Sequence, residues 1–259
     1  MGAPSTCACA RAQRVGEGKT SQDVCAVIVA GGSGERFGDP RGKQFVELLG
    51  MPLVAWSIMA FDHAPSVRHV VVVSPQTRMD MMRDEVLARL ELRNQVTLAA
   101  AGQTRQDSVF SGLVAAPEDL PLVAIHDGAR PLVEVEAIER CVAAVRNDPQ
   151  VDGAICASRV TDTLKVVNAD GLVMGSPDRS AFWGAQTPQV FRRTTIVRAH
   201  EWALLEGFVG TDDASLVEQR GGKVRVIESP RDNIKVTVPE DLAIAEATLR
   251  SRMGMEYWG

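Results

Sequence analysis

The chain has 259 residues and contains no apolar run long enough to span a lipid bilayer, so we expect no membrane association. It also lacks an excess of positive charge. The net charge of −5 argues against a dedicated nucleic-acid binder, which usually carries a basic face. A single nucleotide is not excluded by this charge, because a few well-placed cations suffice to bind one. There are only four histidines and no recognisable Ser-His-Asp pattern, so little supports chemistry driven by a general base.

Cysteine is scarce as well. The five thiols are Cys7, Cys9, Cys25, Cys141 and Cys156. The Cys7-x-Cys9 pair has no second pair of ligands, so we expect no zinc site. The other three lie in apolar segments and are predicted to be small buried hydrophobes. This usage is typical of a reducing compartment, and we predict a cytoplasmic protein.

The first residues differ in composition from the remainder. Residues 1–22 are rich in Ala, Gly, Arg and Ser and show no hydrophobic period. They lack the apolar segment of a secretory signal and are short for an organellar transit peptide. We therefore predict a disordered tail over 1–22 and a single folded domain over 23–252.

In the rest of the chain, short apolar runs alternate with amphipathic segments. The expected strands cover 25–30, 69–74, 96–100, 122–126 and 153–157. Helical spacing of apolar residues appears over 79–90 and 135–145, and further helices are expected to begin near Arg105 and at Pro239. This alternation predicts an α/β fold, a Rossmann-like three-layer sandwich with a mainly parallel sheet. Ligands of such folds bind at the carboxyl ends of the strands.

One segment departs from this alternation. Residues 160–173 contain two short strand-like runs around Asn168-Ala-Asp-Gly171, which is typical of a β-hairpin. The sequence leaves two interpretations open, namely an edge decoration of the sheet or an arm that grips a second subunit.

A glycine-rich loop, Gly31 to Gly38, directly follows the first expected strand. It is not a Walker A loop, because Gly42-Lys43 is followed by Gln44 where Ser or Thr is required. Nor is it a dinucleotide fingerprint, because Phe37 stands where Gly or Ala is needed. Arg36 and Lys43 could each be an ordinary surface cation. Together beside glycines at a strand end, they favour polyphosphate binding.

The glycine loop together with Lys43-Gln-Phe resembles the opening of the sugar-phosphate nucleotidyltransferase superfamily. Six further motifs, in order and spacing, are similar to the 2-C-methyl-D-erythritol 4-phosphate cytidylyltransferase family. They are Gly102-Gln-Thr-Arg-Gln-Asp-Ser108-Val, His126-Asp-Gly-Ala-Arg130-Pro, Thr161-Asp-Thr163-Leu-Lys, Ala185-Gln-Thr187-Pro-Gln, Thr211-Asp-Asp-Ala-Ser215 and Asp232-Asn-Ile-Lys235-Val-Thr. The likeness covers about residues 24–247, and Gly128 stands where the family often has alanine.

The resemblance implies a reaction and its partners. A member of this family transfers CMP from CTP to 2-C-methyl-D-erythritol 4-phosphate, giving 4-diphosphocytidyl-2-C-methyl-D-erythritol and pyrophosphate for isoprenoid precursors of the non-mevalonate pathway. Mg²⁺ would be bound mainly through the CTP phosphates, with no metal-binding residue assigned in the protein. The resemblance also implies a homodimer, formed through an arm over 158–180 that completes the partner's site.

The same resemblance assigns roles to individual residues. Four cations would be catalytic: Arg36 and Lys43 at the transition state and pyrophosphate, and Arg179 and Lys235 at the acceptor phosphate. CTP would be held by Ala30, Gly31, Gly32, Gly34, Gly102, Ser108 and Asp127. The acceptor would contact Arg130, Thr163, Thr187 and Thr211.

Without the resemblance, several of these residues have plainer interpretations. Asp127 and Arg130 could be a strand-end ion pair, and Thr163 a β-former in the hairpin. Lys235 could be an outward-facing strand lysine, and Arg179 a loop residue.

Three other functions are compatible with parts of the sequence. A ribitol 5-phosphate cytidylyltransferase shares the fold and several motifs, although the threonine-led Thr211-Asp-Asp-Ala-Ser favours the methylerythritol enzyme. A dinucleotide oxidoreductase would need an acidic residue at the end of the second strand, where Ser74-Pro75 stands. A non-catalytic nucleotide-binding regulator would not be expected to retain all four cations.

Overall fold

The structure is a computed structural model that describes residues 21–32 and 37–254. Within these residues, seven strands form a central sheet in the order β11-β7-β10-β6-β1-β4-β5. Their bounds are β1 Val24–Val29, β4 Val67–Ser74, β5 Gln95–Ala100, β6 Leu122–Asp127, β7 Gly153–Arg159, β10 Trp183–Arg192 and β11 Val224–Glu228. Only β10 runs antiparallel to its neighbours among these strands. The five strands expected from apolar runs are all present.

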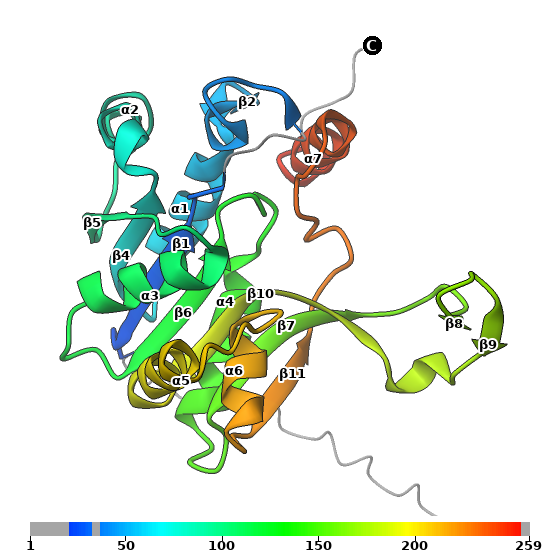
Figure 1. The fold of residues 1–259 in the computed structure, drawn as a ribbon. Helices are drawn as coiled ribbons and strands as arrows, with labels where there is room; N and C mark the ends of the chain where they lie inside the picture. The colour runs from blue at the N-terminus through cyan, green and yellow to red at the C-terminus, as the bar shows by residue number, and fades with distance from the viewer. Residues whose placement is uncertain (1–20, 33–36, 255–259) are drawn as a thin grey trace, which may run out of the picture.

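Helices cover both faces of the sheet (Figure 1). One face packs against α1 (Leu53–His63) and α4 (Val135–Arg146), and the other against α3 (Arg105–Ala115), α5 (Arg193–Glu206) and α6 (Asp213–Gln219). Strand β1 shows why its sequence is continuously apolar. Ala26 and Ile28 point into one apolar cluster and Cys25 and Val27 into the other, and all four are fully buried. The predicted Rossmann-like three-layer sandwich is confirmed.

A third, smaller apolar cluster joins the last helix to the segment after the glycine loop. Helix α7 (Pro239–Arg252) packs beside the short pair β2 (Glu47–Leu48) and β3 (Met51–Pro52). As expected, α7 begins at a proline, with Glu240 and Asp241 in its first turn. A 3₁₀ turn, η2 (Lys43–Phe45), precedes this layer.

The predicted helix over 79–90 is present but irregular. After the 3₁₀ turn η3 (Gln76–Arg78), it consists of α2 (Met79–Met81), a π-helical turn η4 (Met82–Val86) and a 3₁₀ turn η5 (Leu87–Arg89). Met82 and Val86 are both fully buried in the core. The apolar spacing therefore identified the buried face, while packing altered the helix geometry.

Strand β10 was not expected from the sequence. It lies in the middle of the sheet although it contains Pro188, which cannot donate a hydrogen bond to a neighbouring strand. The pairing register jumps from Ala185 to Gln189, so the residues between them leave the ladder. This irregularity accommodates the proline and carries Thr187 toward the end of β6.

The predicted hairpin is also present. Strands β8 (Val166–Val167) and β9 (Val173–Gly175) pair antiparallel, and Gly171 at the turn has φ +81°. The hairpin follows β7 and precedes β10 in the chain, and it stands away from the body of the molecule (Figure 1). Its apolar side chains are exposed in the single chain: Val166, Val167, Leu172, Val173 and Met174.

The predicted disordered tail, 1–22, lies almost wholly outside the described residues. Among the described helices, none combines the length and apolar character that a bilayer crossing requires.

Candidate active site

A cavity of about 780 Å³ opens where β1, β5 and β6 end. Its walls come from the loops that follow these strands and from the segment that leads into α7. The lining residues are Val29, Ala30, Gly31, Gly32, Lys43, Gln44, Gly102, Gln103, Thr104, Arg105, Ser108, Asp127, Gly128, Ala129, Lys235 and Thr237. Residues as far apart in the chain as Val29 and Thr237 thus meet at the carboxyl edge of the sheet, the expected place for a ligand.

Two glycines allow the loops of this cavity to approach one another. A Cβ on Gly31 would lie 2.6 Å from Cβ of Ala101, and a Cβ on Gly102 would lie 2.3 Å from Cβ of Asp107. The Ser108 hydroxyl accepts from Gly102 N at 3.1 Å and donates to Thr104 O at 2.8 Å. Ser108 therefore fixes the second loop, and its contact with the base stays a prediction.

Gly128 is packed nearly as closely. A Cβ there would lie 3.0 Å from Cγ2 of the buried Val54 and 3.2 Å from Val29 O. Glycine in place of the family's frequent alanine therefore suits the packing in this chain.

Lys43 and Gln44 attach the segment after the glycine loop to this edge. The Lys43 ammonium donates to Val236 O at 2.8 Å, and Gln44 Nε2 donates to Ala30 O at 2.9 Å. Lys43 thus lines the same cavity as Gly31 and Gly32. Arg36 and Gly34, the other predicted members of this loop, lie outside the described residues.

Three cations surround the carboxylate of Asp127. Lys235 Nζ lies 2.9 Å from Oδ2, Arg105 Nε 3.0 Å from Oδ1, and Arg130 Nε 3.7 Å from Oδ2. Burial alone would raise the pKa of Asp127, but the charges of Arg105 and Lys235 hold that pKa well below its usual value. Asp127 is therefore ionised, and it holds these three cations together beside the cavity.

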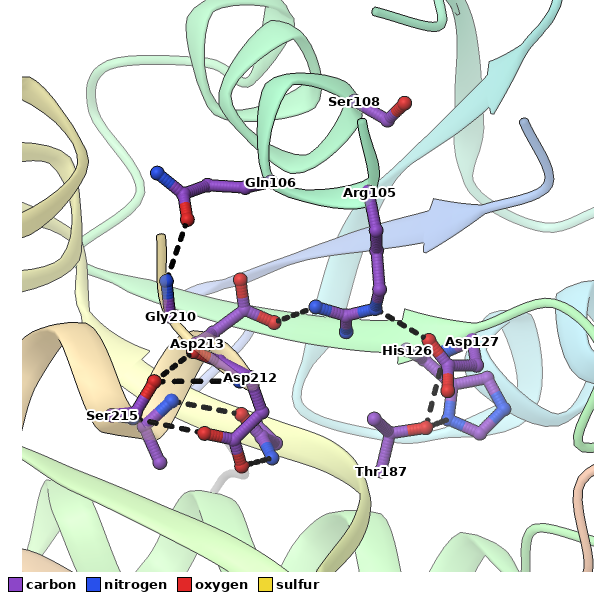
Figure 2. Close-up of polar contacts among 12 residues, drawn as sticks. Arg105, Gln106, Ser108, His126, Asp127, Thr187, Gly210, Asp212, Asp213 and Ser215 are labelled. Atoms are coloured by element: carbon purple, nitrogen blue, oxygen red, sulfur yellow. Dashed lines mark hydrogen bonds and ion pairs between the residues drawn. The ribbon is translucent and has the colours of Figure 1, made fainter. Parts of the chain in front are cut away.

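His126 and Thr187 hold the backbone on either side of Asp127 (Figure 2). His126 Nε2 lies 3.2 Å from Arg130 O, which can only accept, so this nitrogen carries the proton. The Thr187 hydroxyl donates to His126 Nδ1 and accepts from Asp127 N, both at 3.0 Å. This chain of hydrogen bonds fixes the turn from Asp127 to Arg130. An additional contact of Thr187 with the acceptor stays a prediction.

His126 is predicted to make the fold sensitive to acid. Full burial lowers its pKa from the usual 6.5 to about 3, so between these values the unfolded chain binds a proton that the folded chain does not. Stability should fall as the pH decreases below 6.5, by about 2 kcal/mol from this group between pH 7 and 5.

Urea unfolding of the wild type and His126→Gln at both pH values tests this expectation. The variant should lose about 2 kcal/mol less than the wild type over that interval. An identical loss in the two proteins would show that His126 does not titrate on unfolding.

The remaining predicted residues do not line the cavity in the single chain. Thr163 and Arg179 are exposed on the arm, where Arg179, in the turn η6 (Arg179–Ala181), donates to Thr161 O. Thr211 is exposed just before α6. The chain alone therefore brings together the nucleotide side of the predicted site and Lys235, but not the arm residues.

Two residues without a predicted role support this site. Asn233 donates to Thr187 O at 2.9 Å and accepts from Arg130 through its backbone carbonyl at 2.8 Å. Arg105 forms ion pairs with two carboxylates (Figure 2). One signal could have identified Arg105, because an arginine at the first position of a helix opposes the helix dipole and calls for an acidic partner.

Taken together, the parallel sheet, the glycine loops and the cations at the strand ends define a nucleotide-binding α/β protein of the Rossmann-like class. A family model described as IspD, 2-C-methyl-D-erythritol 4-phosphate cytidylyltransferase, matches residues 24–251. The chain belongs to this family.

Individual relatives are similar over most of their length. The chain is 40% identical to the 2-C-methyl-D-erythritol 4-phosphate cytidylyltransferase of Caldanaerobacter subterraneus, over 88% of this chain and 99% of the relative. It is 43% identical to the enzyme of the same name from Syntrophotalea carbinolica, over 87% and 96%. Among solved structures, 4-diphosphocytidyl-2C-methyl-D-erythritol synthase from Anaerococcus prevotii superposes with a TM-score of 0.78 at 28% identity, over 88% and 98%.

Proposed function

We propose that the protein transfers CMP from CTP to 2-C-methyl-D-erythritol 4-phosphate, releasing pyrophosphate. The observation that carries this proposal is the cavity in which two glycine loops face Lys43 and Lys235, in a chain that belongs to this family. Glycine loops leave backbone N–H groups accessible to phosphate oxygens, and the lysines supply the opposite charge.

The proposed chemistry needs cations more than a base. The acceptor is a phosphate monoester with a second pKa near 6, so its oxygen is already an anionic nucleophile at pH 7. That oxygen forms a bond to the α-phosphorus of CTP, the bond from this phosphorus to the bridging oxygen breaks, and pyrophosphate leaves with the electron pair. The barrier comes from repulsion between anions and from charge on the five-coordinate phosphorus.

The charged residues are assigned to this barrier. Lys43, with Arg36, would stabilise the transition state and the departing pyrophosphate. Lys235, with Arg179, would hold the acceptor phosphate for attack. Asp127 is paired with Lys235 at 2.9 Å and, by its resemblance to the family's residue, would lie near the ribose and the acceptor alcohol.

We place Mg²⁺ on the triphosphate of CTP. The described part of the chain contains no group of three or more His, Cys, Asp or Glu side chains suited to holding a metal ion. The Asp127 carboxylate at the cavity is already paired with cations. Mg²⁺ would enter with the nucleotide and neutralise part of its phosphate charge.

We further propose a cytoplasmic homodimer held together by the arm, 158–180. The arm exposes a strip of apolar side chains, which favours burial against a second copy. It also carries Thr163 and Arg179 away from their own cavity, which would be explained if they reach the partner's.

Comparing two acceptors tests the proposed reaction. Purified protein with CTP and Mg²⁺ should release pyrophosphate faster with 2-C-methyl-D-erythritol 4-phosphate than with ribitol 5-phosphate. A higher kcat/KM for ribitol 5-phosphate would replace the proposal with the alternative cytidylyltransferase. No release with either acceptor would refute both.

A further inference from the structure

We propose that Arg105 is a positioning residue of this site, which clamps Asp127 to the buried Asp213 and thereby keeps Lys235 available to the acceptor phosphate. The inference rests on the proposed function for the identity of that phosphate. The clamp itself rests on contacts among described residues.

The guanidinium of Arg105 lies between two carboxylates (Figure 2). Its Nε is 3.0 Å from Asp127 Oδ1, at the end of β6, and its Nη1 is 2.9 Å from Asp213 Oδ2, at the first position of α6. Arg105 is itself the first residue of α3, which Thr104 caps. One side chain therefore ties a strand end to the first turns of two helices from opposite halves of the chain.

Asp213, the second carboxylate of this clamp, is buried and held in place by its neighbours. Its side chain is 1% exposed, and His200 Nε2 lies 3.4 Å from Oδ1 while the His200 ring stacks on Phe110. Burial alone would raise the pKa of Asp213, but the charge of Arg105 and the nearby His200 lower it, so the group stays an anion. The first turn of α6 adds favourable N–H dipoles.

The charges that Arg105 already meets distinguish clamping from phosphate binding. Arg105 lines the cavity, yet its Nε and Nη1 both face carboxylates. A planar guanidinium can address two acids at fixed angles, whereas a lysine ammonium is a single point of charge. Arg105 is therefore suited to hold Asp127 in place while other cations meet the ligand.

The other cations around Asp127 allow Lys235 to leave it for a ligand. In the structure, Lys235 is paired with Asp127. If Lys235 turns toward a phosphate, Asp127 keeps Arg105 and Arg130 as partners and is not left buried and unpaired. Without Arg105, Asp127 would hold Lys235 more tightly, and the acceptor phosphate would have to compete for it.

Arg105→Gln, Arg105→Lys and the double variant Arg105→Gln/Asp213→Asn test the clamp. In assays of pyrophosphate release, Arg105→Gln should lower kcat/KM for the acceptor about 10²-fold, the effect typical of a misplaced reacting group. Arg105→Lys, which keeps the charge but only one contact, should recover part of the loss. The exposed Arg83→Gln is the matched control and should behave like the wild type.

The double variant separates positioning from folding. Arg105→Gln alone leaves Asp213 buried without its main counter-ion and is expected to lower the unfolding temperature. Adding Asp213→Asn removes that buried charge, so the unfolding temperature should recover while turnover stays low. A double variant with wild-type turnover would overturn the inference, because Arg105 would then serve only to neutralise Asp213.

A titration of the Asp127 carboxyl by ¹³C NMR measures the clamp without any substrate. Arg105→Gln should raise the pKa of Asp127 relative to the wild type, because a counter-charge 3.0 Å away is lost. An unchanged titration would overturn the inference even if turnover fell. Wild-type protein that releases no pyrophosphate would refute the proposed function instead and leave this test of the clamp intact.

Discussion

Lys43→Ala is expected to lower kcat by about 10²–10³-fold while leaving the fold intact, the largest single effect that we predict. Lys43 lines the cavity with the glycine loops, and its ammonium would face the charge that accumulates on the five-coordinate phosphorus and the departing pyrophosphate. In the structure it donates to Val236 O at 2.8 Å, and the loss of one such bond costs about 1 kcal/mol of stability. Catalysis should therefore suffer far more than folding.

Single-turnover kinetics at saturating CTP, together with thermal unfolding, measure the two effects of Lys43→Ala separately. Lys223→Ala removes an exposed lysine that does not line the cavity and serves as the control. If Lys43→Ala kept the wild-type rate, Lys43 would not be a catalytic residue.

Arg179→Ala is expected to lower kcat/KM for the acceptor by about 10²-fold or more, because a cation that holds the phosphate for attack is lost. The reason for a second experiment is the position of Arg179 on the arm. Its own chain does not place it in the cavity, so the proposed dimer would supply it to the partner.

Mixing two inactive variants distinguishes a shared site from a self-contained one. In a heterodimer of Lys43→Ala and Arg179→Ala chains, a shared arrangement gives one site with both defects and one site with neither. Random re-association should therefore restore about a quarter of the wild-type activity, since half of the dimers are mixed and each has one intact site of two. No restoration after proven subunit exchange would contradict the exchange of arms.

Much of the fold could be predicted because parallel strands buried on both faces leave a plain signal. Runs such as Cys25-Ala-Val-Ile-Val-Ala have almost no other explanation, and the turn at Asn168 to Gly171 specifies its hairpin locally. Strand β10 was not foreseen, because Pro188 argues against a central strand and only the tertiary arrangement shows where the ladder is interrupted.

The loops of the site could be predicted from the sequence, but the residues that hold them in place could not. Glycines next to cations point to phosphate from sequence alone, and the motifs singled out Asp127 and Lys235, which line the same cavity. The contact of Arg105 with Asp213 and the hydrogen bond of His126 with Thr187 depend on distances between segments that lie 108 and 61 positions apart. No local pattern encodes such distances, so these supports emerge only when the chain is folded.

Strand β10 connects the arm to the cavity, and its pairing is interrupted between the two. Toward the arm, Trp183 to Ala185 pair with β7, and beyond the interruption Gln189 pairs with both β6 and β7. Thr187 lies between these two paired stretches, and its hydroxyl accepts from the Asp127 amide. In the proposed dimer, a displacement of the arm on binding or release of the partner subunit would reach Asp127 through this stretch. Assembly of the dimer and activity of the site would then be linked.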